Sequence, residues 1–158
     1  MYERILVPLD GSQVGETALP YVEELVSKLA PKVKVEVTLL RVVSTLSHHI
    51  IVGETDARVP YTEQEMEQIR KRAKDYLNIA GKGIKNKGAI LRTKVTTGNA
   101  AEEIIKITDE IKADLVAMST HGRSGISRWA FGSVTDKVLR AGNVPVLVVR
   151  APRDTAKM

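Results

Sequence analysis

The segment from Ser119 to Ser133 combines glycines, hydroxyl side chains and arginines in one short stretch. Glycine lets a backbone approach a phosphate closely, and serine or threonine hydroxyls donate hydrogen bonds to its oxygens. A helix that begins near Gly132 and Ser133 would add unpaired N–H groups and the positive end of its dipole. This chemistry binds anions, phosphates above all. The alternative is a long turn in which the glycines serve turn geometry alone and Ser133 caps the helix.

A carboxylate, Asp10, ends the apolar run that opens the chain, from Ile5 to Leu9. If that run and the strand before Ser119 are neighbours in a parallel sheet, their ends lie side by side and Asp10 faces the glycine loop. There it could accept a hydrogen bond from a ribose hydroxyl or help to hold a phosphate-bound cation. The alternative is an Asp-Gly turn residue that caps the next helix.

Side chains suited to catalysis are few, and the candidates for a base or nucleophile are Asp10, Ser12, His48, His49 and His121. A loop histidine such as His121 is more often a turn or surface residue than a base. The chain has no Gly-x4-Gly-Lys-Ser/Thr loop, so the machinery of P-loop enzymes is absent. These residues favour holding a nucleotide over turning it over.

The elements that must position these groups alternate between apolar runs and helical periodicity. Near-continuous apolar strands joined by amphipathic helices are typical of a parallel sheet covered on both faces. We therefore expect an α/β fold: one doubly wound, five-stranded parallel sheet with helices on both faces and strand order 3-2-1-4-5. The expected strands are 4–10, 33–43, 89–96, 114–119 and 145–150, and the expected helices are 14–30, 62–82, 100–111 and 134–141.

Two segments fall outside this alternation. Residues 44–60 have no clear period and contain Gly53 and Pro60, which predicts a long loop or irregular insertion that could close over the site. Residues 81–88 are rich in glycine but follow a helix and precede a strand, the reverse of the order in a phosphate loop, so we interpret them as a helix end.

Composition narrows the class of protein. The 158 residues carry 24 basic and 19 acidic side chains, a net charge of +5, and no cysteine, which excludes disulfides and thiolate chemistry. Aromatic residues make up only 4%, too few for the stacking platforms of single-strand binders, so nucleic-acid binding is not expected. No apolar run is long enough to span a membrane, and we expect a cytoplasmic protein. One domain over 1–150 and a polar tail over 151–158 complete the expected organisation.

The pattern Ser119-x2-Gly122-x9-Gly132-Ser133 has the spacing of the phosphate motif Gly-x2-Gly-x9-Gly-Ser/Thr, which is found in the universal stress protein family. Nearly the whole chain resembles that family. Its opening strand with aspartate is similar to residues 5–10, its second strand to 39–43 and its closing strand to 143–149. The pattern Val95-x2-Gly98-x-Ala100 resembles its third-strand exit.

The resemblance implies a universal stress protein-like ATP site, with Mg²⁺ or Mn²⁺ held through the phosphates. Gly122, Gly132 and Ser133 would hold phosphates. Asp10 would lie near ribose and phosphate. The full set of implied binding residues is Pro8, Leu9, Asp10, Val42, Val95, Gly98, Met118, Ser119, His121, Gly122, Arg123, Gly132, Ser133 and Val134. This chain departs from the pattern at Ser119, where ATP-binding members carry glycine; its side chain could crowd a phosphate or donate to it.

Three functions stay open on these residues. The first is an ATP-binding regulatory or stress-response module with little or no hydrolysis. The second is an interaction protein of the same family that binds no nucleotide, and the third is a slow ATP hydrolase. The last strand, from Val144 to Val149, is β-branched and uncharged. At a sheet edge it would pair with another chain, so we expect a homodimer, in agreement with the resemblance.

Overall fold

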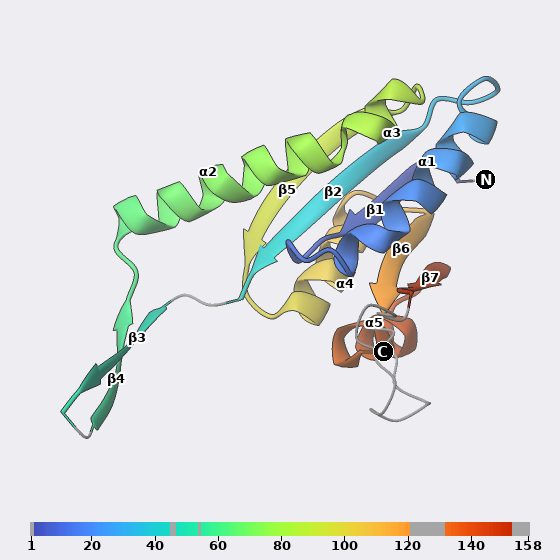
Figure 1. Ribbon diagram of the computed structural model, residues 1–158. Coiled ribbons are helices and arrows are strands. Elements are labelled where there is room, and N and C mark those ends of the chain that lie inside the picture. The colour runs from blue at the N-terminus through green and yellow to red at the C-terminus, as the bar shows by residue number, and fades with distance from the viewer. Residues whose placement is uncertain (1, 45–46, 54, 121–131, 153–158) are drawn as a thin grey trace.

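The computed structural model describes residues 2–44, 47–53, 55–120 and 132–152. Its centre is a parallel sheet in the order β5-β2-β1-β6-β7 (Figure 1). Counted along the chain within this sheet, the order is 3-2-1-4-5, so the predicted doubly wound α/β fold is confirmed. The strands are β1 (Arg4–Pro8), β2 (Glu36–Val43), β5 (Ile90–Thr97), β6 (Leu115–Thr120) and β7 (Val146–Arg150).

Helices cover both faces of the sheet. A short 3-10 helix, η1 (Gly15–Ala18), leads into α1 (Leu19–Leu29), which packs with α2 (Glu63–Ala80) and α3 (Lys82–Asn86) on one face. We call this the α1/α2 face. The opposite face, the α4/α5 face, is covered by α4 (Ala100–Glu110) and α5 (Ser133–Ala141).

Successive side chains along a strand point to opposite faces of the sheet. In β2, Leu39 packs into the core of the α1/α2 face, and Leu40 packs into the core of the α4/α5 face. Both side chains are fully buried. A strand buried on both faces needs apolar residues at consecutive positions, and this is why β1 and β2 read as continuous apolar runs.

Local signals start two of the helices where the sequence predicts. The Thr62 hydroxyl accepts a hydrogen bond from the Glu65 N–H at the start of α2, and the Asn99 side chain accepts one from the Glu102 N–H at the start of α4. Each cap satisfies one of the N–H groups that a helix start leaves without a partner, which is worth about 1 kcal/mol.

The prediction of a loop over 44–60 is wrong. The chain forms an antiparallel hairpin, β3 (Ser47–Val52) and β4 (Thr55–Pro60), which projects beyond the ends of β2 and α2 (Figure 1). His48 and His49 belong to β3. Gly53 has a φ of +65° and permits the turn between the strands. A glycine in a segment without a clear period suggests irregular structure, but a glycine between two β-forming runs is also a hairpin signal.

The segment 81–88 also differs from the prediction. Gly81 ends α2, as a helix end requires, but the chain then forms the further short helix α3. Ile84 of α3 is fully buried against the α1/α2 face. Burial of the Ile84 side chain stabilises this short helix, in which Gly83 is a poor helix former.

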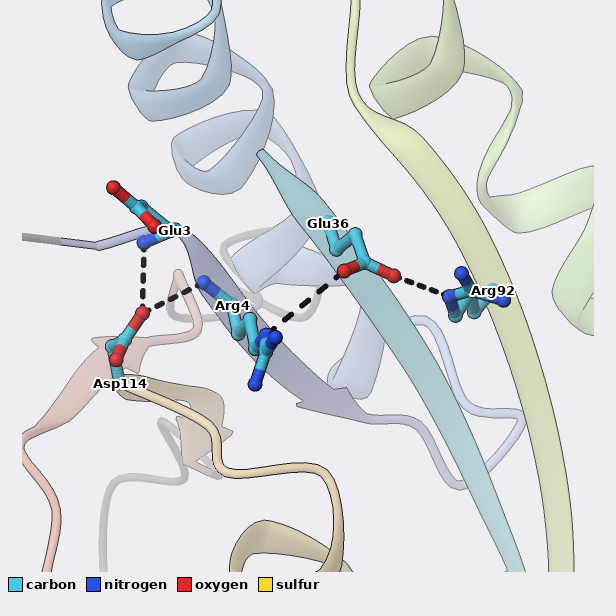
Figure 2. A network of polar contacts seen from close by, with 5 residues as sticks. All are labelled: Glu3, Arg4, Glu36, Arg92 and Asp114. Atoms are coloured by element: carbon cyan, nitrogen blue, oxygen red, sulfur yellow. Dashed lines mark hydrogen bonds and ion pairs between the residues drawn. The ribbon is translucent and has the colours of Figure 1, made fainter. Parts of the chain in front are cut away.

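Polar contacts join the strands at their N-terminal ends (Figure 2). Asp114 Oδ2 accepts hydrogen bonds from the backbone N–H groups of Glu3 (2.9 Å) and Arg4 (2.8 Å). Glu36 is paired with Arg92 and lies 3.9 Å from Arg4. The hydrogen bond from Arg92 holds the pKa of the Glu36 carboxyl below its usual range. These contacts tie neighbouring strands together at the N-terminal end of the sheet, which lies opposite the candidate site.

Candidate functional site

A cavity of about 270 Å³ lies at the C-terminal ends of β1, β2 and β6. It is closed on the α4/α5 face by the first turns of α4, and the N-terminus of α5 lies beside the end of β6 (Figure 1). Here the crossovers on the two sides of β1 leave in opposite directions, which is where doubly wound sheets bind their ligands. The volume is close to the lower end of ligand pockets, about 300 to 1,000 Å³.

The cavity gathers most of the residues that the sequence analysis selected. Its lining includes Pro8, Leu9, Asp10, Val42, Met118, Ser119, Gly132, Ser133 and Val134. Three others, His121, Gly122 and Arg123, lie outside the described residues. The structure thus brings together the end of β1, the end of β2 and the start of α5. The part that their residues play in binding stays a prediction.

Val95 does not line the cavity, and the sheet register explains why. Arg41 pairs with Val95, and Val42 pairs with Thr96. Because neighbouring positions on a strand face opposite ways, Val95 and Val42 lie on opposite faces of the sheet. Val95 packs against the core of the α1/α2 face, whereas Val42 belongs to the core of the α4/α5 face. Val95 thus lies outside the cavity lining, and its part in binding stays a prediction.

Gly98 lies outside the cavity lining as well. It has a φ of +135°, a conformation that side chains rarely adopt, and its N–H donates to the Val43 carbonyl at 3.1 Å. The glycine turns the chain from β5 into the Asn99 cap of α4. Its place is in the backbone turn that precedes α4, whose residues Ala100 and Ile104 do reach the cavity.

Several lining residues were missed by the sequence analysis. Leu40 could have been found from strand alternation, because it precedes Val42 by two positions and shares its face. No sequence pattern marks Gly15, Thr120 or Thr135 as site residues, apart from their closeness in sequence to residues that were predicted to bind. The full set of missed residues is Gly15, Leu40, Arg41, Ser44, Ala100, Ile104, Thr120 and Thr135.

The two ends of the cavity differ in chemistry. Near β2 and α4 the lining includes the apolar side chains of Leu40, Val42 and Ile104, with the polar residues Arg41 and Ser44 beside them. Near the end of β6 and the start of α5 it presents hydroxyls and backbone, with Thr120, Gly132 and other small polar residues. An apolar end suits an aromatic base, and a polar end rich in donors suits an anion.

The start of α5 has the features of an anion site. Gly132 is the N-cap residue, and no side chain caps this helix start. The alternative in which Ser133 is the cap is therefore wrong, since Ser133 is the first helical residue. The first N–H groups of a helix have no partner within it, and together with the dipole they favour negative charge.

Asp10 lies between the two ends and is held by its neighbours. Both the backbone N–H (2.9 Å) and the hydroxyl (2.5 Å) of Ser12 donate to Asp10 Oδ1. Partial burial raises the pKa of the Asp10 carboxyl, but the hydrogen bonds from Ser12 and the charge of Arg41 outweigh burial and bring that pKa below its ordinary 3.8. Asp10 is thus an ionised acceptor at neutral pH.

Arg41 contributes a cation to the rim of the cavity. Its side chain is half-buried, and its Nη1 donates to the Val42 carbonyl at 2.9 Å. Among the described residues it makes no ion pair within 4 Å.

The family model of the universal stress protein family matches residues 1–150. The chain belongs to the universal stress protein family. It is 30% identical over 159 aligned residues to universal stress protein MJ0577 of Methanocaldococcus jannaschii, covering 95% of this chain and 96% of that protein.

Solved structures of universal stress proteins share the fold. One, described as a universal stress protein in complex with cAMP, has a TM-score of 0.62 and 22% identity and covers 96% of this chain and 98% of its own. Another, from Archaeoglobus fulgidus in complex with dAMP, has a TM-score of 0.61 and 19% identity, covering 94% and 98%. Nucleotide complexes thus occur among the structural neighbours of this chain.

Two further observations concern the part of the chain that the structure describes. None of its helices combines the length and apolar character needed to cross a membrane. Within the same residues, no three histidine or acidic side chains come together in a way that could hold a metal ion.

Proposed function

We propose that this universal stress protein binds ATP in the cavity at the ends of β1, β2 and β6 and acts in the cytoplasm as a regulatory or stress-response module. The observation that carries the proposal is the order of groups along the cavity. An apolar end lies beside β2 and α4, the ionised Asp10 lies at the middle strand, and the uncapped start of α5 lies at the far end. Base, ribose and phosphates of a nucleotide follow in the same order.

The family neighbours support this assignment. Two of the structures with this fold are described as cAMP and dAMP complexes, which are adenine nucleotides. In our proposal the base packs near Val42 and Met118, Asp10 accepts a hydrogen bond from ribose, and the phosphates approach Gly132 and Ser133. Gly122 and Arg123 from the glycine loop would complete the phosphate site, with Mg²⁺ or Mn²⁺ on the phosphate oxygens.

Little or no hydrolysis is the second part of the proposal. Hydrolysis needs a base to activate water. Among the described lining residues the only carboxylate is Asp10, whose lowered pKa makes it a weak base and which is engaged by Ser12. A slow ATP hydrolase is the alternative, and His121 is the residue that would favour it. An interaction protein without nucleotide is the other.

The test combines binding and turnover on the same protein. Titration calorimetry with ATP is expected to give saturable heat with about one site per chain. Prolonged incubation with ATP and magnesium, followed by product analysis, is expected to return ATP intact. Saturable heat with accumulation of ADP would support the slow hydrolase, and the absence of heat would support the interaction protein.

We also propose that two copies form a homodimer through β7. Within the part of the chain that the structure describes, this strand is an edge of the sheet with β6 as its one neighbour. The opposite edge, β5, carries Arg92 and Lys94, whose ion pairs with Glu36 and Glu110 discourage pairing of that edge. Residues 146–149 of β7 carry no charge, so β7 is the edge that favours a second strand.

A further inference from the structure

A chain of hydrogen bonds links the end of β6 to Asp10. The Ser119 hydroxyl donates to the Gly15 carbonyl at 3.0 Å. The Gly15 N–H donates to the Ser12 hydroxyl oxygen at 3.0 Å, and that hydroxyl in turn donates to Asp10 Oδ1 at 2.5 Å. We call these four residues the Asp10 relay.

The hydrogen bond to the Gly15 carbonyl uses the one proton of the Ser119 hydroxyl. A serine hydroxyl has one donor, and in this structure it is used by the Gly15 carbonyl. Ser119 thus cannot donate to a phosphate while it holds this bond, and its side chain is turned toward the loop after β1. Ser119 stands where the family motif has glycine. Its side chain therefore contacts the loop that follows β1.

Gly15 lets the relay close. A Cβ at this position would lie 2.7 Å from Asp10 Oδ1 and 3.4 Å from the Ser12 hydroxyl oxygen. Any side chain would push the carboxylate out of its place, so the backbone of Gly15 can pass close to Asp10 only as glycine. Its peptide groups then carry the connection, accepting from Ser119 on one side and donating to Ser12 on the other.

The relay leaves one oxygen of Asp10 for a ligand. Oδ1 accepts both bonds from Ser12, whereas no hydrogen bond to Oδ2 is formed by the described residues. An ionised carboxylate accepts hydrogen bonds and donates none. With Oδ1 occupied, the carboxylate is held in one orientation, and Oδ2 offers a fixed acceptor for a hydroxyl group at the cavity.

We propose that Ser119 is a positioning residue that, through Gly15 and Ser12, sets a preference for nucleotides with ribose hydroxyls over those without them. The proposal rests on the proposed nucleotide site for its ligand. Without the Ser119 bond the loop after β1 gains freedom, Ser12 and Asp10 shift, and the acceptor loses its fixed direction. The hydroxyl-dependent part of binding falls, while contacts to base and phosphates persist.

The first arm of the test measures selectivity. The ratio of the affinities for ATP and 2′,3′-dideoxy-ATP is expected to fall about fivefold in Ser119→Ala, the worth of one net hydrogen bond. Ser119→Thr keeps the hydroxyl and is expected to restore the ratio. Ser27→Ala is the matched control, because the Ser27 hydroxyl also donates to a carbonyl, that of Glu24 at 2.7 Å, but within α1.

The second arm needs no ligand. Carboxyl titration by NMR is expected to show the pKa of Asp10 closer to its ordinary value in Ser119→Ala and closer still in Ser12→Ala. Other ionisable groups at this cluster are Arg41 of β2, which lowers the pKa of Asp10, and Tyr76 of α2, which interacts with both Asp10 and Glu16. Burial raises the pKa of Tyr76 to about 12, so it stays neutral over the titrated range.

The two arms separate the possible failures. If wild type binds no ATP, the proposed function fails, and the NMR titration alone decides the relay. An Asp10 titration in Ser119→Ala equal to that of wild type overturns the relay. An unchanged ratio of ATP to dideoxy-ATP in a folded Ser119→Ala that binds ATP overturns the assigned role of Ser119 in selectivity.

Discussion

Replacing Gly132 with alanine is expected to weaken ATP binding tenfold or more and to leave the stability of the free protein nearly unchanged. Gly132 has φ −48° and ψ 153°, a conformation open to alanine, and no described atom lies within 4 Å of the position that a Cβ would take. The methyl group therefore fits the free protein. It would stand where we propose that phosphates approach the start of α5, and a tenfold loss corresponds to about 1.4 kcal/mol.

Adenosine provides the internal control for Gly132→Ala. It lacks phosphates, so its affinity is expected to be the same in wild type and variant, as measured by the same calorimetric titration. Thermal unfolding of the two free proteins should agree, since a surface change without strain or lost contact shifts stability by about 0.5 kcal/mol or less. Equal losses for ATP and adenosine would place the defect outside the phosphate site.

Replacing Val148 with proline is expected to convert the proposed dimer into a monomer. The Pro145 carbonyl and the Ala151 N–H bond to β6, so the odd-numbered residues of β7 direct their backbone groups to β6. In a parallel strand the even-numbered residues then direct theirs outward. Proline at 148 removes one outward N–H without breaking the ladder to β6.

The matched control is Val148→Thr, which keeps the backbone N–H and the branched shape of the side chain. Light scattering is expected to give twice the chain mass for wild type and for Val148→Thr, and a single chain mass for Val148→Pro. A wild type with the mass of one chain at micromolar concentration contradicts the dimer. A folded Val148→Pro that stays dimeric moves the interface away from this edge.

The sheet and its order could be predicted because apolar runs and helical periods alternate regularly along this chain. Strands such as β1 and β2 are buried on both faces, so nearly every position is apolar and the signal is strong. The hairpin of β3 and β4 was not predicted because its sequence shows no clear hydrophobic period. Gly53 then suggested a loop, although it is the turn of a hairpin.

The sequence predicts at which end of the strands the candidate site lies, but it does not always predict on which face of the sheet a residue lies. Asp10, Val42 and Gly132 follow from the rule that ligands lie at the C-terminal ends of parallel strands. The face on which Val95 lies depends on the register of β5 against β2, which a single sequence does not give. The Asp10 relay depends on a contact between residues 15 and 119, and no local pattern encodes such a contact.

The most direct test of the nucleotide site is the change in methyl NMR signals when ATP is added to the wild-type protein. We expect saturable shifts at the methyl groups of Val42, Met118 and Val134, which line the cavity. Val95 and Leu77, in the core of the α1/α2 face, are expected to keep their signals. Shifts centred on Val95 and Leu77, or none at saturating ATP, would contradict the proposed nucleotide site.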